Sequence, residues 1–287
     1  MSTGGREEAP SAGQAATQEA VEAVESVGRS AIQLVEDVGG IALMGLQTAV
    51  WLFRPPYRLK NLVSQLDYIG VGSIFVVGIT GLFTGMVFAV QTYHAFSLFD
   101  AQGLVGATVA LSLSRELAPV FAGLMVTARV GSAIATELGS MRVSEQIDAL
   151  ATMAVDPLQY LVVPRVVACV AMMPVLTMLF DTVGIMGAYL VAVFGMGVDA
   201  ATFLGRIRTW VDPEDILGGL IKAAVFGLLI SLIACYKGYN AKGGAKGVGT
   251  ATNEAVVMGS VTVLVVDYFL SLLLASFWST HAARGPG

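Results

Sequence analysis

The residues that could carry chemistry in this sequence are few, and they form no recognisable catalytic group. The only two histidines, His94 and His281, stand far apart, and Cys169 and Cys235 lie inside apolar runs without a CxxC or Cys/His neighbour. A zinc site or a disulfide framework needs such neighbours at a characteristic spacing. The sequence therefore predicts no metal site, no catalytic dyad and two buried free thiols.

Charged residues inside apolar segments are a second chemically capable set. Each costs roughly 2.5 to 3.5 kcal/mol to insert into a membrane and usually faces the protein interior. Arg115 and Glu116 are adjacent, so on a helix they point about 100° apart and we expect them to have different partners. Lys222 and Asp267 fall in neighbouring apolar segments, where pairing would offset both costs. Structural pairing is favoured over a proton relay, and Asp181 has no predicted partner.

A polar run between two apolar segments, residues 137–165, is the third candidate. A short helix in this run would have Ser144 as its N-cap and would carry Glu145 and Asp148 in its first turn, where carboxylates stabilise a helix. The Asp156-Pro157 dipeptide would end that helix. It is either a plain connector or a docking helix that accepts force from a cytosolic partner, and composition does not decide between the two.

A nucleotide-binding loop is missing from the sequence. A Walker A loop needs G-x-x-x-x-G-K-[ST], because backbone amides cradle the phosphates, the lysine neutralises them and the hydroxyl holds the metal. The nearest stretch, residues 243–250, reads GGAKGVGT and has its lysine and threonine out of register. We expect a flexible basic turn there, and any ATPase must be a separate polypeptide.

The composition shows which elements must position these residues. Of 287 residues, 55% are hydrophobic and 13% are charged, and the mean hydropathy is +0.75. An ordinary soluble domain carries roughly 25% charged residues. So much apolar surface argues against a soluble enzyme, a disordered scaffold and a nucleic-acid binder, and it indicates an all-α membrane protein.

Five apolar segments predict five transmembrane helices. The clearest, Tyr68–Tyr93, has 26 residues without a charge, which is about 39 Å of helix. The expected spans are 68–93, 104–128, 166–198, 216–236 and 255–278. No fixed-period repeat is visible, so an inverted-repeat transporter has no support.

The net charge of −5 belongs to the N-terminal part of the chain. Residues 1–37 contain seven acidic and two basic side chains, and the remainder is neutral. Residues 1–29 lack the features of a signal peptide and are expected to be a partly disordered or loosely helical cytosolic tail. Residues 30–60 show helical apolar spacing and close in aromatic and basic residues, which indicates an interfacial amphipathic helix. The membrane body is expected over 61–280.

Lysine and arginine in the short connections predict the orientation. Bases precede span one and recur between spans two and three and between spans four and five: Arg54, Arg58, Lys60, Arg129, Arg142, Arg165, Lys237, Lys242 and Lys246. The other two connections have no base or an excess of acids. We therefore expect a cytoplasmic N-terminus and a periplasmic C-terminus.

A GxxxG motif, Gly81 to Gly85, lies in the first span. Small residues four apart let helix backbones approach closely in a membrane. The motif has two interpretations: helix packing within one subunit, which is the simpler one, or a seam between two subunits.

Three runs in the sequence resemble one protein family. SLSRELAPV (112–120), ARVGSAIATELGSMRVSEQIDALATMAVDPLQYLVVPR (128–165) and ATNEAVVMGSVTVLVVDYFL (251–270) are similar to the MlaE/YrbE permease family, and the likeness extends from about Trp51 to Leu274. Members are membrane subunits of ABC transporters that work with MCE-domain proteins on lipids. The acidic N-terminal tail is longer than we expect of a typical member.

The resemblance implies a homodimer of subunits with an interfacial helix, five spans and a cytosolic coupling helix between spans two and three. The coupling segment, which would seat in the ATPase subunit, is implied to be Glu137, Gly139, Met141, Arg142, Glu145, Gln146, Asp148, Ala149 and Leu150. A lipid pocket or dimer seam is implied at Gly81, Leu82, Gly85, Val87, Val90, Gln91, Tyr93, Gln102 and Val105.

The implied partners are a separate cytosolic ATPase that holds ATP and Mg, an MCE-domain protein and a phospholipid substrate. A small cytosolic regulatory subunit is a further partner that the resemblance allows, and this chain is expected to bind no cofactor and no nucleic acid. Two alternatives stay open. One is an ion-coupled secondary transporter that uses Asp181, Lys222 and Asp267 as a relay, and the other is a structural anchor without bound lipid.

Overall fold

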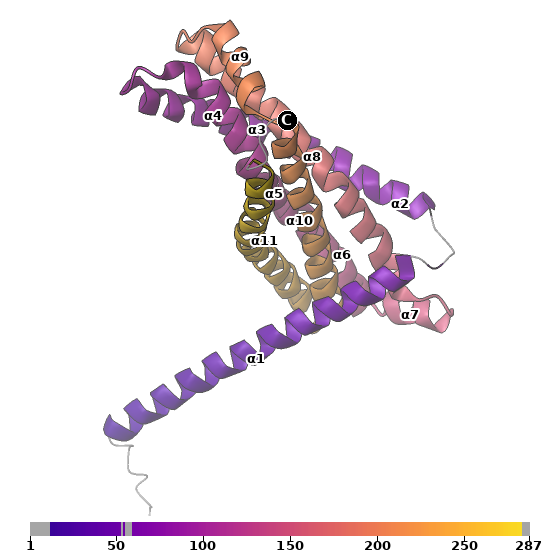
Figure 1. Ribbon diagram of the computed structural model, residues 1–287. Helices are drawn as coiled ribbons and strands as arrows, with labels where there is room; N and C mark the ends of the chain where they lie inside the picture. Colours follow the sequence, from indigo (N-terminus) through magenta and orange to yellow (C-terminus); the bar gives the residue numbers. More distant parts are fainter. Residues whose placement is uncertain (1–11, 53, 55–58, 283–287) are drawn as a thin grey trace, which may run out of the picture. The chain divides into compact units, whose positions relative to one another are not determined.

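The computed structural model describes residues 12–52, 54 and 59–282, and its regular elements within these ranges are all helical (Figure 1). Five segments in this part of the chain are long and apolar enough to cross a membrane, which confirms the prediction of an all-α membrane protein with five spans. Their bounds are Leu59–Ser97, Gln102–Val143, Leu158–Gly195, Pro213–Tyr239 and Gly244–Ser276. Each span begins earlier than expected, because polar flanking turns continue the helix.

The spans are built from α-helices joined by tighter or wider turns. Span one comprises α2 (Leu59–Leu66), the π-helical turn η1 (Asp67–Val71) and α3 (Gly72–Ser97). Span two comprises η2 (Gln102–Leu104), α4 (Val105–Ser112), η3 (Leu113–Leu117), α5 (Ala118–Val126), η4 (Thr127–Gly131) and α6 (Ser132–Val143). Span three comprises η5 (Leu158–Val162), α8 (Val163–Tyr189) and η6 (Leu190–Gly195), span four is α10 (Pro213–Tyr239), and span five lies in α11 (Gly244–Ala282). Two short helices lie in connections, α7 (Gln146–Thr152) and α9 (Ala200–Trp210).

The N-terminal helix α1 (Ala12–Leu52) belongs for most of its length to a separate unit, which the structure divides from the rest after Leu46. It begins inside the segment expected to be a tail, since the alanines, glutamates and glutamines of this stretch favour a helix. Residues 1–11 lie outside the described residues. Apolar side chains along α1 are exposed, namely Ile32, Leu34, Val35, Val38, Leu43 and Leu46. The interfacial position of this helix stays a prediction.

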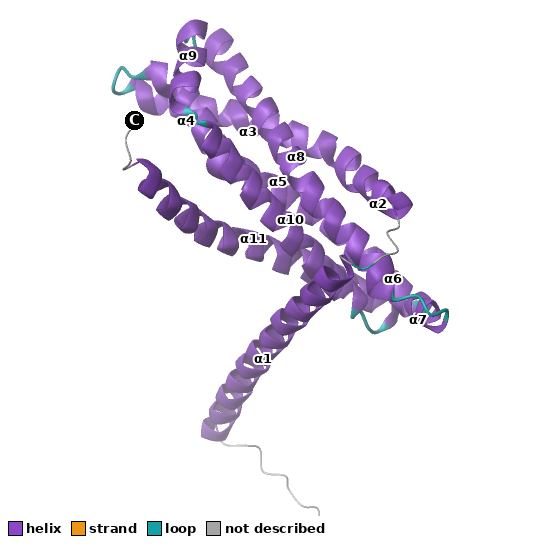
Figure 2. Cartoon of the chain, turned by 45° about the vertical axis from the view of Figure 1, so that its right-hand side comes forward, coloured by secondary structure: helices purple, strands orange, loops and turns teal. Residues whose placement is uncertain are grey.

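Glycines join α3 to α8, and the two helices run side by side (Figure 2). A Cβ on Gly85 would overlap the backbone of Gly184, and one on Gly81 would lie 3.0 Å from the carbonyl oxygen of Phe180. Gly187 meets the backbone of α3 in the same way. The GxxxG motif therefore serves packing within one subunit. Gly81 and Gly85 are both buried against α8, and the expectation that they line a seam or pocket stays a prediction.

Helix α10 is the most buried of the five spans, and α11 is the least. α10 contacts α8, α6 and α11, with Gly227 against the backbone of Cys169 and Gly238 against that of Ala135. Both cysteines are free and buried, as predicted. α11 leaves a row of large apolar side chains uncovered: Val257, Val261, Leu264, Val265, Tyr268, Phe269, Leu272 and Leu273.

Candidate functional site

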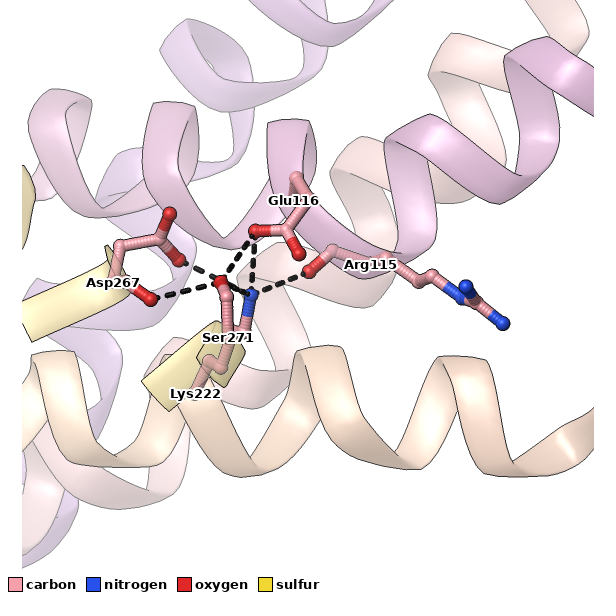
Figure 3. Close-up of polar contacts among 5 residues, drawn as sticks. All are labelled: Arg115, Glu116, Lys222, Asp267 and Ser271. Carbon is pink, nitrogen blue, oxygen red and sulfur yellow. Dashed lines mark hydrogen bonds and ion pairs between the residues drawn. The ribbon is translucent and has the colours of Figure 1, made fainter. Parts of the chain in front are cut away.

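A cluster of charged side chains joins spans two, four and five (Figure 3). Lys222 of α10 is at its centre, with Glu116 of η3 on one side and Asp267 of α11 on the other. The Lys222 Nζ lies 2.6 Å from Glu116 Oε2 and 3.3 Å from Asp267 Oδ1. The predicted pairing of Lys222 with Asp267 is present, but the contact with Glu116 is the shorter.

Hydrogen bonds around Lys222 use all three ammonium donors. Besides its bond to Glu116, Nζ donates to the Ser271 hydroxyl at 2.7 Å and to the carbonyl oxygen of Arg115 at 3.0 Å. The Ser271 Oγ lies 2.9 Å from Glu116 Oε2 and 2.8 Å from the carbonyl oxygen of Asp267. Asp267 Oδ1 has no hydrogen bond of its own, so its contact with Lys222 is purely an ion pair.

The guanidinium of Arg115 points away from this cluster (Figure 3), and its acidic partner is Asp215. Its Nη2 lies 2.6 Å and its Nε 2.7 Å from Asp215 Oδ1 at the start of α10. Asp215 also accepts from the backbone N–H of Asp212 in a capping box, so the helix start fixes the acid. Arg115 and Glu116 have different partners, as their angular separation predicts.

Together these contacts can fix spans two, four and five relative to one another along their axes. Among the described residues, Arg115 pairs with Asp215, and Lys222 pairs with Glu116 and Asp267. Both basic side chains are therefore held by acids, and neither is free to carry a proton between sites. Asp181 of α8 is not among the partners: its Oδ1 and the Thr177 Oγ1 one turn away are buried without a hydrogen bond. The relay of Asp181, Lys222 and Asp267 is therefore not assembled in this structure.

The loop between spans two and three is a second candidate site. Ser144 is the last residue of the α6 turn rather than an N-cap, and its Oγ donates to the carbonyl oxygen of Ser140 at 2.7 Å. Glu145 occupies the capping position of α7 in a left-handed conformation, with φ of 59°. α7 ends at Thr152, before Asp156, whose carboxylate instead accepts from the first amides of span three. Ser144 was expected to cap the start of α7 and the Asp156-Pro157 dipeptide to end it, and both expectations are wrong. Ser144 follows the end of α6, and Asp156 accepts hydrogen bonds at the start of span three.

Helix α7 and its capping residue expose four of the nine implied coupling residues. Ile147 is its buried anchor, and the exposed side chains are Glu145, Gln146, Asp148 and Ala149. Arg142 of α6 lies 2.7 Å from Asp148 and stacks 5.8 Å from the ring centre of Tyr239 on α10. The loop is therefore a small polar surface held to the bundle by one apolar side chain and one arginine.

Two implied coupling residues, Glu137 and Gly139, contact other spans. Glu137 lies 2.8 Å from Arg165 at the base of span three, and Arg165 itself is buried. A Cβ on Gly139 would lie 3.3 Å from Val248 of α11, so this glycine permits close helix contact. Met141 and Leu150 are half-buried. Glu137 and Gly139 thus join span two to spans three and five, and their part in coupling stays a prediction.

The residues implied for a lipid pocket differ in exposure within the single chain. Val87 and Gln91 are exposed on α3, on the face opposite the buried Gly85. Leu82, Val90, Tyr93 and Gln102 are half-buried, and Val105 is fully buried at the start of α4. Only Val87 and Gln91 of these seven residues are exposed in the single chain, and the pocket stays a prediction.

Three contributors to these sites were missed from the sequence. Asp215 stands three residues after Asp212, which is the spacing of a capping box. Ser271 follows Asp267 by four residues and so shares its helix face. Arg165 was counted from the sequence as a basic loop residue on the cytoplasmic side, and no feature of the sequence indicated that its side chain is buried.

Comparisons with known proteins cover most of the described bundle. A family model described as "Permease MlaE" matches residues 62–273. A probable ABC transporter permease protein of Rickettsia conorii is 47% identical over 222 residues, which are 77% of this chain and 86% of that protein. The intermembrane phospholipid transport system permease protein MlaE of Haemophilus influenzae is 41% identical over 214 residues, or 74% and 82% of the two chains. The chloroplastic protein TRIGALACTOSYLDIACYLGLYCEROL 1 of Arabidopsis thaliana is 36% identical over 231 residues, or 80% and 66%.

Proposed function

The chain belongs to the MlaE permease family, and from this premise we propose that it moves phospholipids or related lipids between the inner membrane and an MCE-protein conduit. The single observation that carries the proposal is the match over residues 62–273, which includes spans two to four, α7 and nearly all of spans one and five. The Haemophilus influenzae relative is named for intermembrane phospholipid transport. The chain itself is a multi-pass membrane protein and an ABC transporter permease.

The ATPase is proposed to be a separate cytosolic subunit that holds ATP and Mg and seats on α7. The exposed Glu145, Gln146 and Asp148 offer it acidic and polar contacts, while Ile147 secures the helix from behind. α6 is the last helix of span two and lies directly before α7 in the chain, so a displacement of α7 has a direct path into the membrane. ATP-driven closure of the ATPase would bias a two-state arrangement of the spans. A small regulatory subunit would bind the ATPase side of the same assembly.

A homodimer is proposed around the uncovered faces of α3 and α11. Val87 and Gln91 on α3 are exposed in the single chain, and a second copy facing them would supply the other half of a lipid pocket. In this arrangement the N-terminus is cytoplasmic and the C-terminus periplasmic. The loop that holds α7 is then on the ATPase side of the membrane.

The test is charge reversal of Asp148 in the full complex, reconstituted with its ATPase and MCE partners. Asp148→Arg should abolish ATP-dependent lipid transport and ATPase copurification while thermal unfolding of the permease stays unchanged, because the side chain is exposed. Glu214→Arg, an exposed acid at the opposite end of the bundle, is the matched control and should transport normally. Normal transport by Asp148→Arg would contradict the coupling role.

The ion-coupled transporter is disfavoured by the geometry, because Lys222 and Asp267 pair with each other and Asp181 lies outside their cluster. It requires transport driven by a proton gradient without an ATPase, so an ATPase that copurifies with the chain eliminates it. The structural anchor requires a dimer without lipid. Native mass spectrometry of the purified dimer tests that requirement directly.

A further inference from the structure

Span two carries three arginines, and only two of them have acidic partners. Arg115 pairs with Asp215 and Arg142 pairs with Asp148. Arg129, on the π-helical turn η4, makes no ion pair with any residue that the structure describes. A guanidinium is always charged and is costly to leave without an anion near a membrane interior.

The Arg129 side chain nevertheless has defined contacts on span one with Tyr68, Gly72 and Ser73, which we call its seat. Its Nη1 donates to the Ser73 Oγ at 2.9 Å and to the carbonyl oxygen of Tyr68 at 3.3 Å. Its Cζ lies 5.5 Å from the centre of the Tyr68 ring, in cation–π geometry. A Cβ on Gly72 would overlap the guanidinium, so the absence of a side chain at this position makes the seat possible.

Two π-helical turns meet at this seat. Tyr68 lies in η1 and Arg129 lies in η4, and Gly72 and Ser73 open α3 immediately after η1. Turns of this kind interrupt regular helix hydrogen bonding and are frequent at functional sites. The seat therefore combines two local departures from the α-helix with one obligatory glycine.

Most of the guanidinium's donors remain unused. Arginine has five N–H groups in a planar fork that suits carboxylate or phosphate oxygens. Nη1 makes both of the hydrogen bonds, and Nε and Nη2 donate to no acceptor within the described ranges. The nearby Asp67 is exposed and does not pair with Arg129. An anion from outside the chain can thus be held by at least two donors.

The position of Tyr68 and Arg129 along the membrane normal indicates which anion binds there. Tyr68 begins the uncharged stretch of span one and is exposed, as are Val71 and Phe75 beside it. Tyrosine and arginine at the end of an apolar segment lie at the level of lipid headgroups. The phosphate of a phospholipid is the anion that is abundant there.

We propose that Arg129, with Tyr68, Gly72 and Ser73, forms a binding site for the phosphodiester of a phospholipid in the leaflet next to this end of span one. The site lies at the opposite end of α3 from Gln91 and Tyr93, so it is separate from the implied lipid pocket. It requires only that the chain spans a membrane. Its failure would leave the ABC transporter role untouched.

The test uses the full chain in phosphatidylcholine vesicles that contain phosphatidylglycerol with a photoreactive diazirine at the headgroup. After irradiation, mass spectrometry should locate crosslinks in residues 68–75 and 127–132. Arg129→Gln should reduce this yield about tenfold, because a charge-assisted hydrogen bond is worth roughly that factor or more. Arg129→Lys should be intermediate, since the charge remains but the planar fork is lost.

Gly72→Ala is the sharper variant, because it displaces the guanidinium while it leaves the charge in the chain. It should lower the yield severalfold, and Gly78→Ala, on the same helix with open space around it, should not. Equal crosslinking of wild type and Gly72→Ala would overturn the site. So would complete competition by inorganic phosphate, or crosslinks that join this seat to a second copy of the chain.

Discussion

The charge cluster of the spans and the loop around α7 use the same kind of contact in opposite surroundings. Lys222 lies 2.6 Å from Glu116, and Arg142 lies 2.7 Å from Asp148. In the first pair Lys222 is 3% and Glu116 47% exposed, whereas in the second Arg142 is 37% and Asp148 62% exposed, so only the first pair has a buried member. Distance alone does not distinguish the two pairs, but burial does.

This difference determines what each pair can contribute. Removing one member of a buried ion pair leaves an uncompensated charge and costs about 3 to 5 kcal/mol. An exposed pair is worth about 0 to 1 kcal/mol, because water and salt screen both charges. The cluster is therefore suited to holding spans together, and the loop is suited to exchanging its internal pair for contacts with another protein.

The largest expected effect follows from removing the centre of the cluster. Lys222→Met should lower the free energy of unfolding by about 3 to 5 kcal/mol, because Glu116 and Asp267 lose their common cation. Denaturant unfolding in mixed micelles measures the change. Adding Glu116→Gln and Asp267→Asn to this variant should restore most of the loss, since no unpaired charge then remains. A triple variant as unstable as the single one would show that packing, and not charge, dominates.

The spans could be predicted from the sequence because membrane helices are long and their apolar composition is nearly sufficient. Their ends could not. Span two was expected to end near residue 128 but continues to Val143, since α6 buries Ile134, Ala135 and Leu138 and packs on α10 and α11 outside the purely apolar stretch. Local polarity marks where a helix leaves the apolar layer, not where its hydrogen bonding stops.

The candidate sites could likewise be predicted only in part from the sequence. Lys222 and Asp267 could be paired from the sequence, because two opposite charges in apolar segments have few other solutions. The contact of Glu116 with Lys222 could not be predicted, since it depends on which face of span two turns toward α10. The glycines of α3 show the limit again: a GxxxG motif predicts close approach, and only the fold reveals that α8 is the partner.

An intermediate case should give an intermediate effect. Arg165 is 4% exposed and its partner Glu137 is 55% exposed, which resembles Lys222 and Glu116 at 3% and 47%. Among the described residues Arg165 has no second acidic partner like Asp267, which is 18% exposed, so this pair is less buried than the whole cluster and more buried than the loop pair. Glu137→Gln should destabilise the chain by about 1 to 3 kcal/mol, because the buried arginine loses its charge partner but keeps its bond to the Leu161 carbonyl oxygen. The same unfolding measurement applies. A loss as large as that of Lys222→Met would contradict the ranking by burial.

The loop pair should contribute least to stability. Asp148→Asn should change the free energy of unfolding by less than about 1 kcal/mol, and the difference from wild type should shrink further in 0.5 M salt. Glu254→Gln is a useful comparison, because its partner Lys237 is far more buried than Arg142 and the effect should be larger. If Asp148→Asn proved the more damaging of the two, the loop would have to be regarded as part of the stable bundle.

The smallest effect concerns an exposed cap at the other end of the molecule. Asp199 accepts hydrogen bonds from the backbone N–H of Thr202 at 2.7 Å and from its hydroxyl at 2.8 Å, and these bonds lower the pKa of the carboxyl below 3.8. The contribution of such a group is present above its unfolded pKa and is lost as the pH falls through the lowered folded pKa. Amide exchange at the start of α9 should therefore accelerate below about pH 4, the range of a free aspartate, once corrected for intrinsic rates. Asp199→Asn keeps a capping oxygen without a titrating charge, so this pH dependence should disappear in that variant, and its persistence would assign the effect to another group.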